Sequence, residues 1–235
     1  MKRVLPLLRQ LRRDTSGVAM VEFAVTLPFI AGFALYSMEL TNYALVNMRV
    51  NQIALSLSDN ASRVGTDATL TTQQLREVDM NDVLQAARYQ GRGIRLTTFG
   101  RIIVSSVENV QQTYDAAPVQ RVHWQRCIGL RNGTGYDSRY STTTTAGTDA
   151  TVGNAGTTVA SGVGDPGSLI SAPAGSGLMF VEVNYDYQPL VSGYFLGTTQ
   201  IRFTSSYIIR DNRDLRQIYN PNPAATRSTC NVFAA

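Results

Sequence analysis

The sequence predicts an α+β protein in which a long N-terminal helix packs on a small antiparallel β-sheet. Three observations predict this class. Residues 18–38 form an apolar run that contains a single charged side chain. The residues that follow place apolar side chains at spacings of three and four, the period of an amphipathic helix. Beyond residue 94, several segments alternate apolar and polar residues, the period of a strand with one buried face.

The apolar run is long enough to cross a membrane. At about 1.5 Å per residue it spans about 30 Å, the thickness of the bilayer hydrocarbon. Basic residues precede it and none follows until Arg49, which places the N-terminus in the cytoplasm. The run exceeds the apolar region of a signal peptide, and no small-residue cleavage site follows it. We therefore expect residues 18–40 to be a single transmembrane helix, with the rest of the chain outside the cytoplasm.

The helix is expected to continue beyond the membrane over residues 41–64. No Gly or Pro interrupts residues 33–64, and Gly65 is a plausible stop signal. One helix of about 45 residues should therefore run from Val18 to Val64. Pro28 lies inside the span and should kink it, because proline removes one i→i−4 hydrogen bond. The expected stripe of the outer half is Tyr43, Ala44, Val46, Val50, Ile53, Ala54, Leu57 and Ala61.

The positive charge of the chain is confined to its N-terminus. The chain of 235 residues has a formal net charge of +4, and residues 1–17 alone account for it, since the remaining residues balance. These residues form a basic leader rather than a binding face, so nucleic acid is not an expected partner. The charged residues of the leader are Lys2, Arg3, Arg9, Arg12, Arg13 and Asp14.

Residues 65–235 are expected to form an extracytoplasmic α+β domain. A short helix is expected over residues 78–90, with Asp79 or Asn81 as its N-cap. Three or four antiparallel strands packed on the outer helix would give a two-layer core. The strand segments are 94–110 (one or two strands around Gly100), 119–130, 177–190 and 198–210, with hairpin connections at 111–118 and 191–197.

Residues 131–177 differ in composition from the rest of this domain. They are rich in Gly, Ser and Thr and poor in apolar residues, so they do not predict a core of their own. A segment of this length inside a compact domain is either disordered or functional. The two interpretations are a loose surface insertion, and a display loop or mating surface for another protein.

The two cysteines are Cys127, on a predicted strand, and Cys230, near the C-terminus. No Cys-x-x-Cys motif or Cys/His cluster surrounds either of them, which argues against zinc. In the cytosol they would be two buried thiols, and in an oxidising compartment a disulfide. Because the membrane segment places them outside the cytoplasm, we expect a disulfide that ties the C-terminal tail to the sheet.

No arrangement of residues predicts catalysis. His123 is the only histidine, it stands next to Trp124 on a predicted strand, and no nucleophile motif lies nearby. A core or strand-edge position is a better interpretation for it than a catalytic base. Asp211 and Asp214 lack the pattern of a calcium loop and predict a solvated turn. We expect neither an enzyme nor a bound cofactor or metal.

The charged residue inside the apolar run is Glu22, in the sequence Gly17-Val18-Ala19-Met20-Val21-Glu22. A glycine after a basic leader, with glutamate at the fifth position beyond it, resembles the class III leader of type IV pilin-like proteins. The longer string GVAMVEFAVTLPFI is similar to the TadE family, pseudopilins (minor pilins) of the tight-adherence, or Flp, pilus system. The resemblance is strongest over residues 13–40, with a weaker echo at 181–190.

This resemblance implies a pilin-like fold and cleavage between Gly17 and Val18 by a prepilin peptidase. It also implies a bacterial inner-membrane protein with a periplasmic domain, which can enter an extracellular pilus. The implied partners are other pilins and pseudopilins, the prepilin peptidase and the inner-membrane assembly platform.

Glu22 has two physical interpretations. After cleavage, Val18 would carry a free amino group, and Glu22 of one subunit could neutralise that amine on a neighbour, which makes a charge in hydrocarbon tolerable. Alternatively, Glu22 reaches the inner headgroups, one helical turn away. The alternative function is an uncleaved single-pass membrane protein whose outer domain binds a ligand, as an adhesin does.

Overall fold

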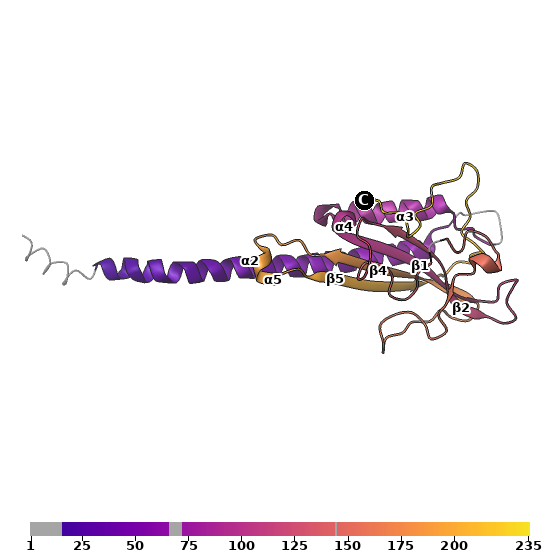
Figure 1. Ribbon diagram of the computed structural model, residues 1–235, viewed down its shortest axis with the longest axis horizontal. Helices are drawn as coiled ribbons and strands as arrows, with labels where there is room; N and C mark the ends of the chain where they lie inside the picture. Colours follow the sequence, from indigo (N-terminus) through magenta and orange to yellow (C-terminus); the bar gives the residue numbers. More distant parts are fainter. Residues whose placement is uncertain (1–15, 66–71, 144) are drawn as a thin grey trace, which may run out of the picture. The chain divides into compact units, whose positions relative to one another are not determined.

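The computed structural model describes residues 16–65, 72–143 and 145–235. It contains a long helix, α2 (Ser16–Arg63), and a five-stranded antiparallel sheet (Figure 1). The predicted α+β class is therefore confirmed. Contacts divide the described residues into two units. The first comprises α2 as far as Ala44 together with residues 189–197, and the second comprises residues 45–188 and 198–235.

Helix α2 matches the helix predicted from the sequence. It is 48 residues long and continues through Pro28, so the proline does not end it, and the kink expected there stays a prediction. In the second unit α2 buries one stripe, because its apolar residues recur every three or four positions. Of the predicted stripe, Tyr43 is half-buried and Ala44 is exposed. The buried members are Val46, Val50, Ile53, Ala54, Leu57 and Ala61.

The C-terminal end of α2 is capped by Arg213. Its guanidinium donates hydrogen bonds to the carbonyl oxygens of Ala61, Ser62 and Val64, at 3.1, 3.1 and 2.6 Å. These carbonyls have no partner within a helix, and a cation stabilises that end of the helix dipole. The solvated turn expected at residues 211–214 is therefore wrong for Arg213, which is buried. The charges in residues 211–214 indicated only a local turn, whereas the contact joins residues about 150 positions apart.

The sheet has the strand order β3-β2-β1-β4-β5, and all neighbouring strands are antiparallel. The four long strands confirm the predicted segments, including the hairpin at 111–118. Residues 94–99 are not a strand, because Arg95 adopts a left-handed conformation (φ 51°) between two short helices. The strands are β1 (Gly100–Val110), β2 (Val119–Ile128), β3 (Thr157–Thr158), β4 (Ser176–Asp186) and β5 (Gln200–Ile208). The two short helices are η1 (Arg92–Ile94) and α4 (Leu96–Phe99).

Helix α3 (Glu77–Gln90) begins one residue before the predicted helix. Its N-cap is Arg76, so the expected cap at Asp79 or Asn81 is wrong. Asp79 instead acts from the third helical position, where its carboxylate accepts a hydrogen bond from the backbone N–H of Arg76 at 3.0 Å. Asn81 donates to the carbonyl oxygen of Thr226 and so holds the C-terminal tail.

The sheet is covered on both faces. On one face, Ser58 of α2 hydrogen-bonds Ser205 of β5 at 2.7 Å. On the other face, residues from the 131–177 segment pack on β1, β2 and β4, and Tyr140 meets Phe180 edge-on at 5.3 Å. The two-layer expectation was therefore incomplete, and the loose-insertion interpretation is wrong. The buried cluster on this second face is Val107, Val122, Val163, Ala172, Leu178 and Phe180.

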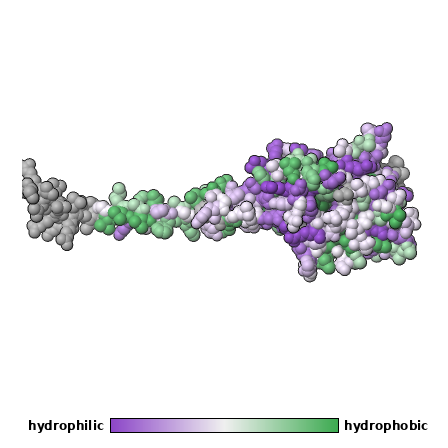
Figure 2. Space-filling view, in the orientation of Figure 1, coloured by the Kyte–Doolittle hydropathy of each residue, from purple (hydrophilic) through white to green (hydrophobic). Residues whose placement is uncertain are grey.

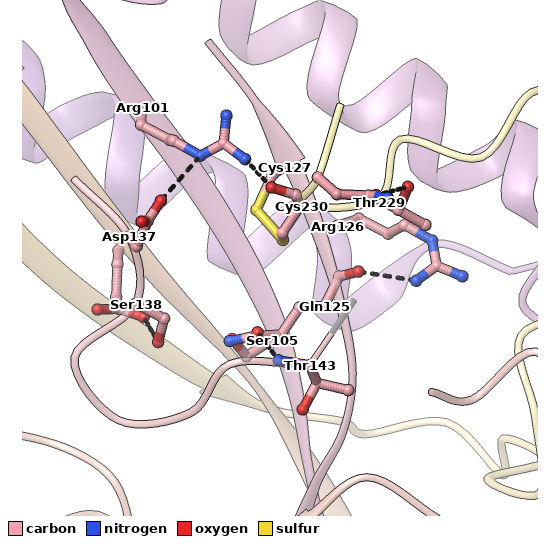
Figure 3. Close-up of a disulfide and its surroundings, with 12 residues drawn as sticks. Arg101, Ser105, Gln125, Arg126, Cys127, Asp137, Ser138, Thr143, Thr229 and Cys230 are labelled. Carbon is pink, nitrogen blue, oxygen red and sulfur yellow. Dashed lines mark hydrogen bonds and ion pairs between the residues drawn. A yellow bond between two sulfur atoms is a disulfide. The ribbon is translucent and has the colours of Figure 1, made fainter. Parts of the chain in front are cut away.

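The predicted disulfide between Cys127 and Cys230 is present, with the two Cα atoms 4.8 Å apart (Figure 3). Backbone hydrogen bonds extend the attachment of the tail, because Cys127 N–H donates to the carbonyl oxygen of Ser228 at 2.7 Å. Arg101 lies beneath the tail and donates to the carbonyl oxygens of Gly129 and Cys230. Burial lowers the pKa of Arg101, and Asp137, 3.9 Å away, opposes that shift. The tail and the 131–177 segment thus share one buried arginine.

Glu182 gives the second unit a pH-dependent stability. Its carboxylate accepts hydrogen bonds from Ser138 Oγ (2.5 Å) and from the Arg139 backbone N–H (3.2 Å). Burial nevertheless raises its pKa above the usual range. Because the folded pKa exceeds the unfolded one, the stabilisation is complete below the unfolded pKa and is lost as pH rises through the folded pKa. We expect Glu182→Gln to raise the free energy of unfolding at neutral pH by about 1 kcal/mol, because it removes a buried charge whose burial is incompletely compensated.

The measurement is urea unfolding at several pH values, followed by the fluorescence of Trp124, the one tryptophan. The difference between variant and parent should vanish below about pH 4. Asp149→Asn is the matched control with the opposite sign, since hydrogen bonds from Asn154 and Thr151 lower the pKa of Asp149. A Glu182→Gln variant that is less stable than the parent at neutral pH would contradict this account.

Candidate functional site

The first half of α2 exposes apolar side chains on all sides. Phe23, Phe29 and Phe33 are 61%, 75% and 73% exposed, and Figure 2 shows apolar residues along this part of the helix. A helix that is apolar all round requires an apolar environment, either a bilayer or other helices. Among the described residues, α2 is the one helix long and apolar enough to cross a membrane. This is compatible with a single-pass membrane protein.

Gly17, Val18 and Glu22 lie in the first turns of α2. All three are exposed. Glu22 lies four positions after Val18, so its Cα is about 6 Å, or one turn, along the helix from the residue that cleavage would make the N-terminus. Among the described residues, Glu22 takes part in no ion pair. The basic leader expected over residues 1–17 falls outside the described residues except for Ser16 and Gly17.

The polar side chain nearest Pro28 bonds within the helix. Thr26 Oγ1 donates to the carbonyl oxygen of Glu22 at 2.8 Å and lies 3.3 Å from that of Phe23. Such back-bonding removes the need for a partner in hydrocarbon. Pro28 lacks a backbone N–H, so the carbonyl oxygen of Ala24 has no helical donor at that position.

Glu39 is the residue that sequence analysis missed. It is fully buried, and it is the one buried side chain among the helix residues between Gly17 and Leu45. Its carboxylate accepts hydrogen bonds from the backbone N–H groups of Leu190 (3.2 and 3.1 Å to its two oxygens) and Val191 (2.7 Å). Peptide N–H groups are strong donors to a carboxylate. Glu39 therefore attaches a distant segment to the apolar helix.

The attached segment connects β4 to β5. It contains a one-turn helix, α5 (Gly193–Leu196), in which Ser192 Oγ accepts the N–H of Tyr194 at 3.1 Å. Gly197 ends the turn in a left-handed conformation (φ 62°) that favours glycine. The connection expected at 191–197 is thus confirmed, and we call residues 189–197 the Glu39 loop. Two of its apolar side chains, Leu190 and Tyr194, are strongly exposed.

A signal for this contact exists in the sequence. The apolar run ends at residue 38, but the expected transmembrane helix, residues 18–40, also contains the carboxylate of Glu39. A carboxylate flanked by apolar residues predicts a specific partner, because it is costly to bury alone. The sequence PLVSGYFLG at 189–197 is apolar for a loop between strands, which is the second half of the signal. The partner could not be named, since about 150 residues separate the two segments.

The second unit contains a buried His–Glu pair. His123 Nδ1 lies 2.7 Å from Glu108 Oε2, and Ser106 Oγ donates to the other oxygen of Glu108 at 2.7 Å. All three side chains are buried, so substrate has no access to them in this state. The core position predicted for His123 is confirmed. Among the described residues, no group of three or more His, Cys, Asp or Glu is arranged to hold a metal ion.

A cavity of about 460 Å³ at the C-terminal end of α3 has a basic lining. Arg88, Arg92 and Arg95 line it, and none of the ion pairs between described residues includes them. The Arg92 guanidinium lies 4.9 Å from the centre of the Tyr89 ring, which restricts its orientation. This cavity could hold an anionic group.

The chain was compared with family models, curated proteins and solved structures. No family model, curated protein or solved structure matches the chain.

Proposed function

We propose that this protein is a TadE-like minor pilin, a structural component that initiates, anchors or tips a tight-adherence pilus. Its leader is removed after Gly17 by a prepilin peptidase, and α2 holds it in the bacterial inner membrane with its folded domain in the periplasm. The observation that carries the proposal is the spacing of Gly17, Val18 and Glu22 at the start of an apolar helix. The exposed apolar surface of α2 supports it, because helix assembly requires such a surface.

Assembly would then use a charge pair between subunits. Cleavage breaks the peptide bond between Gly17 and Val18 by hydrolysis and leaves an amino group on Val18. The Glu22 carboxylate of a neighbouring subunit pairs with that ammonium group in a low-dielectric surrounding, where the attraction is strong. Removing one partner of a buried pair leaves the other charge uncompensated, which costs about 3–5 kcal/mol.

Processing is tested by the mature N-terminus. The intact mass of the protein from cells with an active prepilin peptidase should correspond to a chain that begins at Val18. The same measurement in cells without the peptidase should give the full chain. A chain that begins at Met1 in the first cells would overturn the processing proposal.

We expect Glu22→Ala to reduce incorporation into pili by at least about tenfold, given the cost of an unpaired charge in the membrane. Cleavage after Gly17 should persist. The measurement is the amount of the protein in sheared pili relative to the membrane fraction. Asp59→Ala is the matched control, since Asp59 is an acidic residue of the same helix in an exposed pair with Arg63, and such pairs contribute little. Equal incorporation of the two variants would contradict the pairing role.

The second candidate is an uncleaved single-pass protein whose outer domain binds a ligand. The basic cavity of Arg88, Arg92 and Arg95 favours an anionic ligand, such as a polysaccharide that contains uronic acid. Two results together would support it over the pilin proposal. Polygalacturonate would bind the parent and not a variant with all three arginines changed to Gln, and Glu22→Ala would leave pili unchanged.

A further inference from the structure

The Glu39 loop presents apolar side chains beside the apolar helix. Leu190 is 62% exposed, Val191 36% and Tyr194 91%. The neighbouring turns of α2 expose Met38 (54%) and Leu40 (47%). Loop and helix belong to one unit, and the hydrogen bonds of Glu39 join them. A loop between two strands would ordinarily carry polar residues at these positions, because it faces water.

In a bilayer that α2 crosses from Val18 onward, Glu39 would lie at the outer edge of the hydrocarbon. Glu39 lies 21 positions after Val18, a rise of about 32 Å, which is close to the hydrocarbon thickness of about 30 Å. If Val18 lies at the inner boundary, Glu39 lies at the outer one. Tyrosine and tryptophan, whose rings have an apolar body and a polar end, are enriched at this depth.

The Glu39 carboxylate and the backbone N–H groups of the loop also meet each other's need for a hydrogen-bond partner. A carboxylate at the hydrocarbon edge is costly alone, and so are loop N–H groups without acceptors. Three hydrogen-bond contacts from Leu190 and Val191 to the carboxylate supply both needs. The backbone N–H groups of Leu190 and Val191 are therefore hydrogen-bonded, while the side chains of both residues remain exposed.

We propose that the Glu39 loop is a second membrane anchor, which inserts Leu190, Val191 and Tyr194 into the outer headgroup region of the bilayer that α2 crosses. Glu39 is the positioning residue that holds the loop at that depth. The occupant of the loop's apolar surface is lipid, because Glu39 ties the loop to the apolar helix that is long enough to cross a membrane. The inference rests on the membrane position of α2 but not on cleavage or on pilus assembly.

The anchor would fix the helix at one depth and one rotation, because a loop on one side of the helix meets the interface in one orientation only. A subunit that enters an assembly from the membrane would have to withdraw this loop. The loop would thereby hold the protein at the membrane until assembly contacts replace the lipid.

The test uses the full chain in vesicles of phosphatidylethanolamine and phosphatidylglycerol. Both native cysteines are in the disulfide, so a single introduced cysteine can carry a fluorophore under non-reducing conditions. Three positions are labelled in separate proteins: Tyr194→Cys in the loop, Phe33→Cys in the middle of the apolar run, and Val152→Cys as an exposed site (74%) in the other unit. Lipids carry a quencher either at the headgroup or near the end of the acyl chain.

We expect the Tyr194 site to be quenched by headgroup-labelled lipid, the Phe33 site by chain-end-labelled lipid, and the Val152 site by neither. Quenching of Phe33 without Tyr194 would overturn the loop anchor and leave the spanning helix intact. Failure to quench Phe33 would overturn both. A second copy of the chain could also shield the label at position 194 from aqueous iodide. Such shielding would be lost when added lipid dilutes the protein within the membrane, and that result would overturn the assignment to lipid.

The role of Glu39 is tested by Glu39→Ala in the Tyr194→Cys protein. Loss of the carboxylate should at least halve the headgroup quenching at Tyr194 while quenching at Phe33 stays constant. Glu22→Ala is the matched control, because Glu22 is the other carboxylate of the apolar half of α2 and does not touch the loop. Quenching at Tyr194 that is unchanged in Glu39→Ala would overturn the positioning role. An unchanged Trp124 emission spectrum establishes that each variant is folded.

Discussion

Replacing Cys127 and Cys230 together by serine should lower the free energy of unfolding by about 4–5 kcal/mol, the loop-closure estimate for about 100 residues. The two residues are 103 positions apart, so their bridge restricts the unfolded chain over almost half its length. The tail would also lose its attachment, since the Ser228 and Cys230 carbonyl oxygens accept from Cys127 N–H and Arg101. Urea unfolding followed by Trp124 fluorescence measures the change.

Two controls accompany the disulfide prediction. Reduction of the parent protein should give the same loss as the double serine variant, because both remove the same constraint. Ser228→Ala should cost little, since only the backbone of Ser228 bonds to the strand and its hydroxyl meets Asn81. A loss below about 1 kcal/mol for both reduction and substitution would show that the tail is held by its other contacts alone.

Arg126→Met should lower the free energy of unfolding by about 3–5 kcal/mol, the cost of leaving one charge of a buried pair uncompensated. Arg126 of β2 donates to both carboxylate oxygens of Glu77, the first residue of α3, at 2.8 and 2.5 Å, and both side chains are fully buried. Arg227, 3.4 Å from Glu77, is half-exposed and can compensate only partly. The same unfolding experiment measures this loss.

A double-mutant cycle separates the pair from its surroundings. Glu77→Gln combined with Arg126→Met should be more stable than Arg126→Met alone, because no buried charge then lacks a partner. Arg63→Ala, which removes the exposed pair with Asp59, should cost less than about 1 kcal/mol. The Arg126 guanidinium also lies 5.7 Å from the centre of the Trp124 ring. If the double variant is no more stable than Arg126→Met alone, the lost stability comes from packing against Trp124 rather than from an unpaired charge.

The local pattern of apolar residues predicted the helices and strands of this fold, but not which segments pack against them. The length of the apolar run predicted the first half of α2, the three-and-four spacing of apolar residues predicted its second half, and alternation predicted the four long strands. The N-cap of α3 was mistaken, because a capping box from Arg76 and Asp79 replaced the expected cap. The coverage of the second sheet face was missed as well. A segment rich in Gly, Ser and Thr gave little apolar signal, although Val163 and Ala172 bury fully against the sheet.

The candidate site divides in the same way. Gly17, Val18 and Glu22 lie within two helical turns, so they could be grouped from their spacing in the sequence. The basic leader before them and the apolar run after them support that grouping. Cys127 and Cys230 could be paired because the chain holds only these two. Glu39 could not be assigned, because its partners are backbone N–H groups, which every non-proline residue carries. The apolar composition of residues 189–197 marks the loop as unusual but does not identify it as the partner of Glu39.

An apolar helix with one carboxylate at its start, its amphipathic continuation, four strands and a cysteine pair can all be predicted from the chain, because each depends on sequence neighbours or on residue counts. The partners of the buried charges become visible only in the folded chain. Arg213 caps α2, Arg126 meets Glu77, and Glu39 holds residues 190 and 191. The physical reason is common to all three. A buried charge must find its compensation somewhere, and the chain can bring that partner from any distance along the sequence.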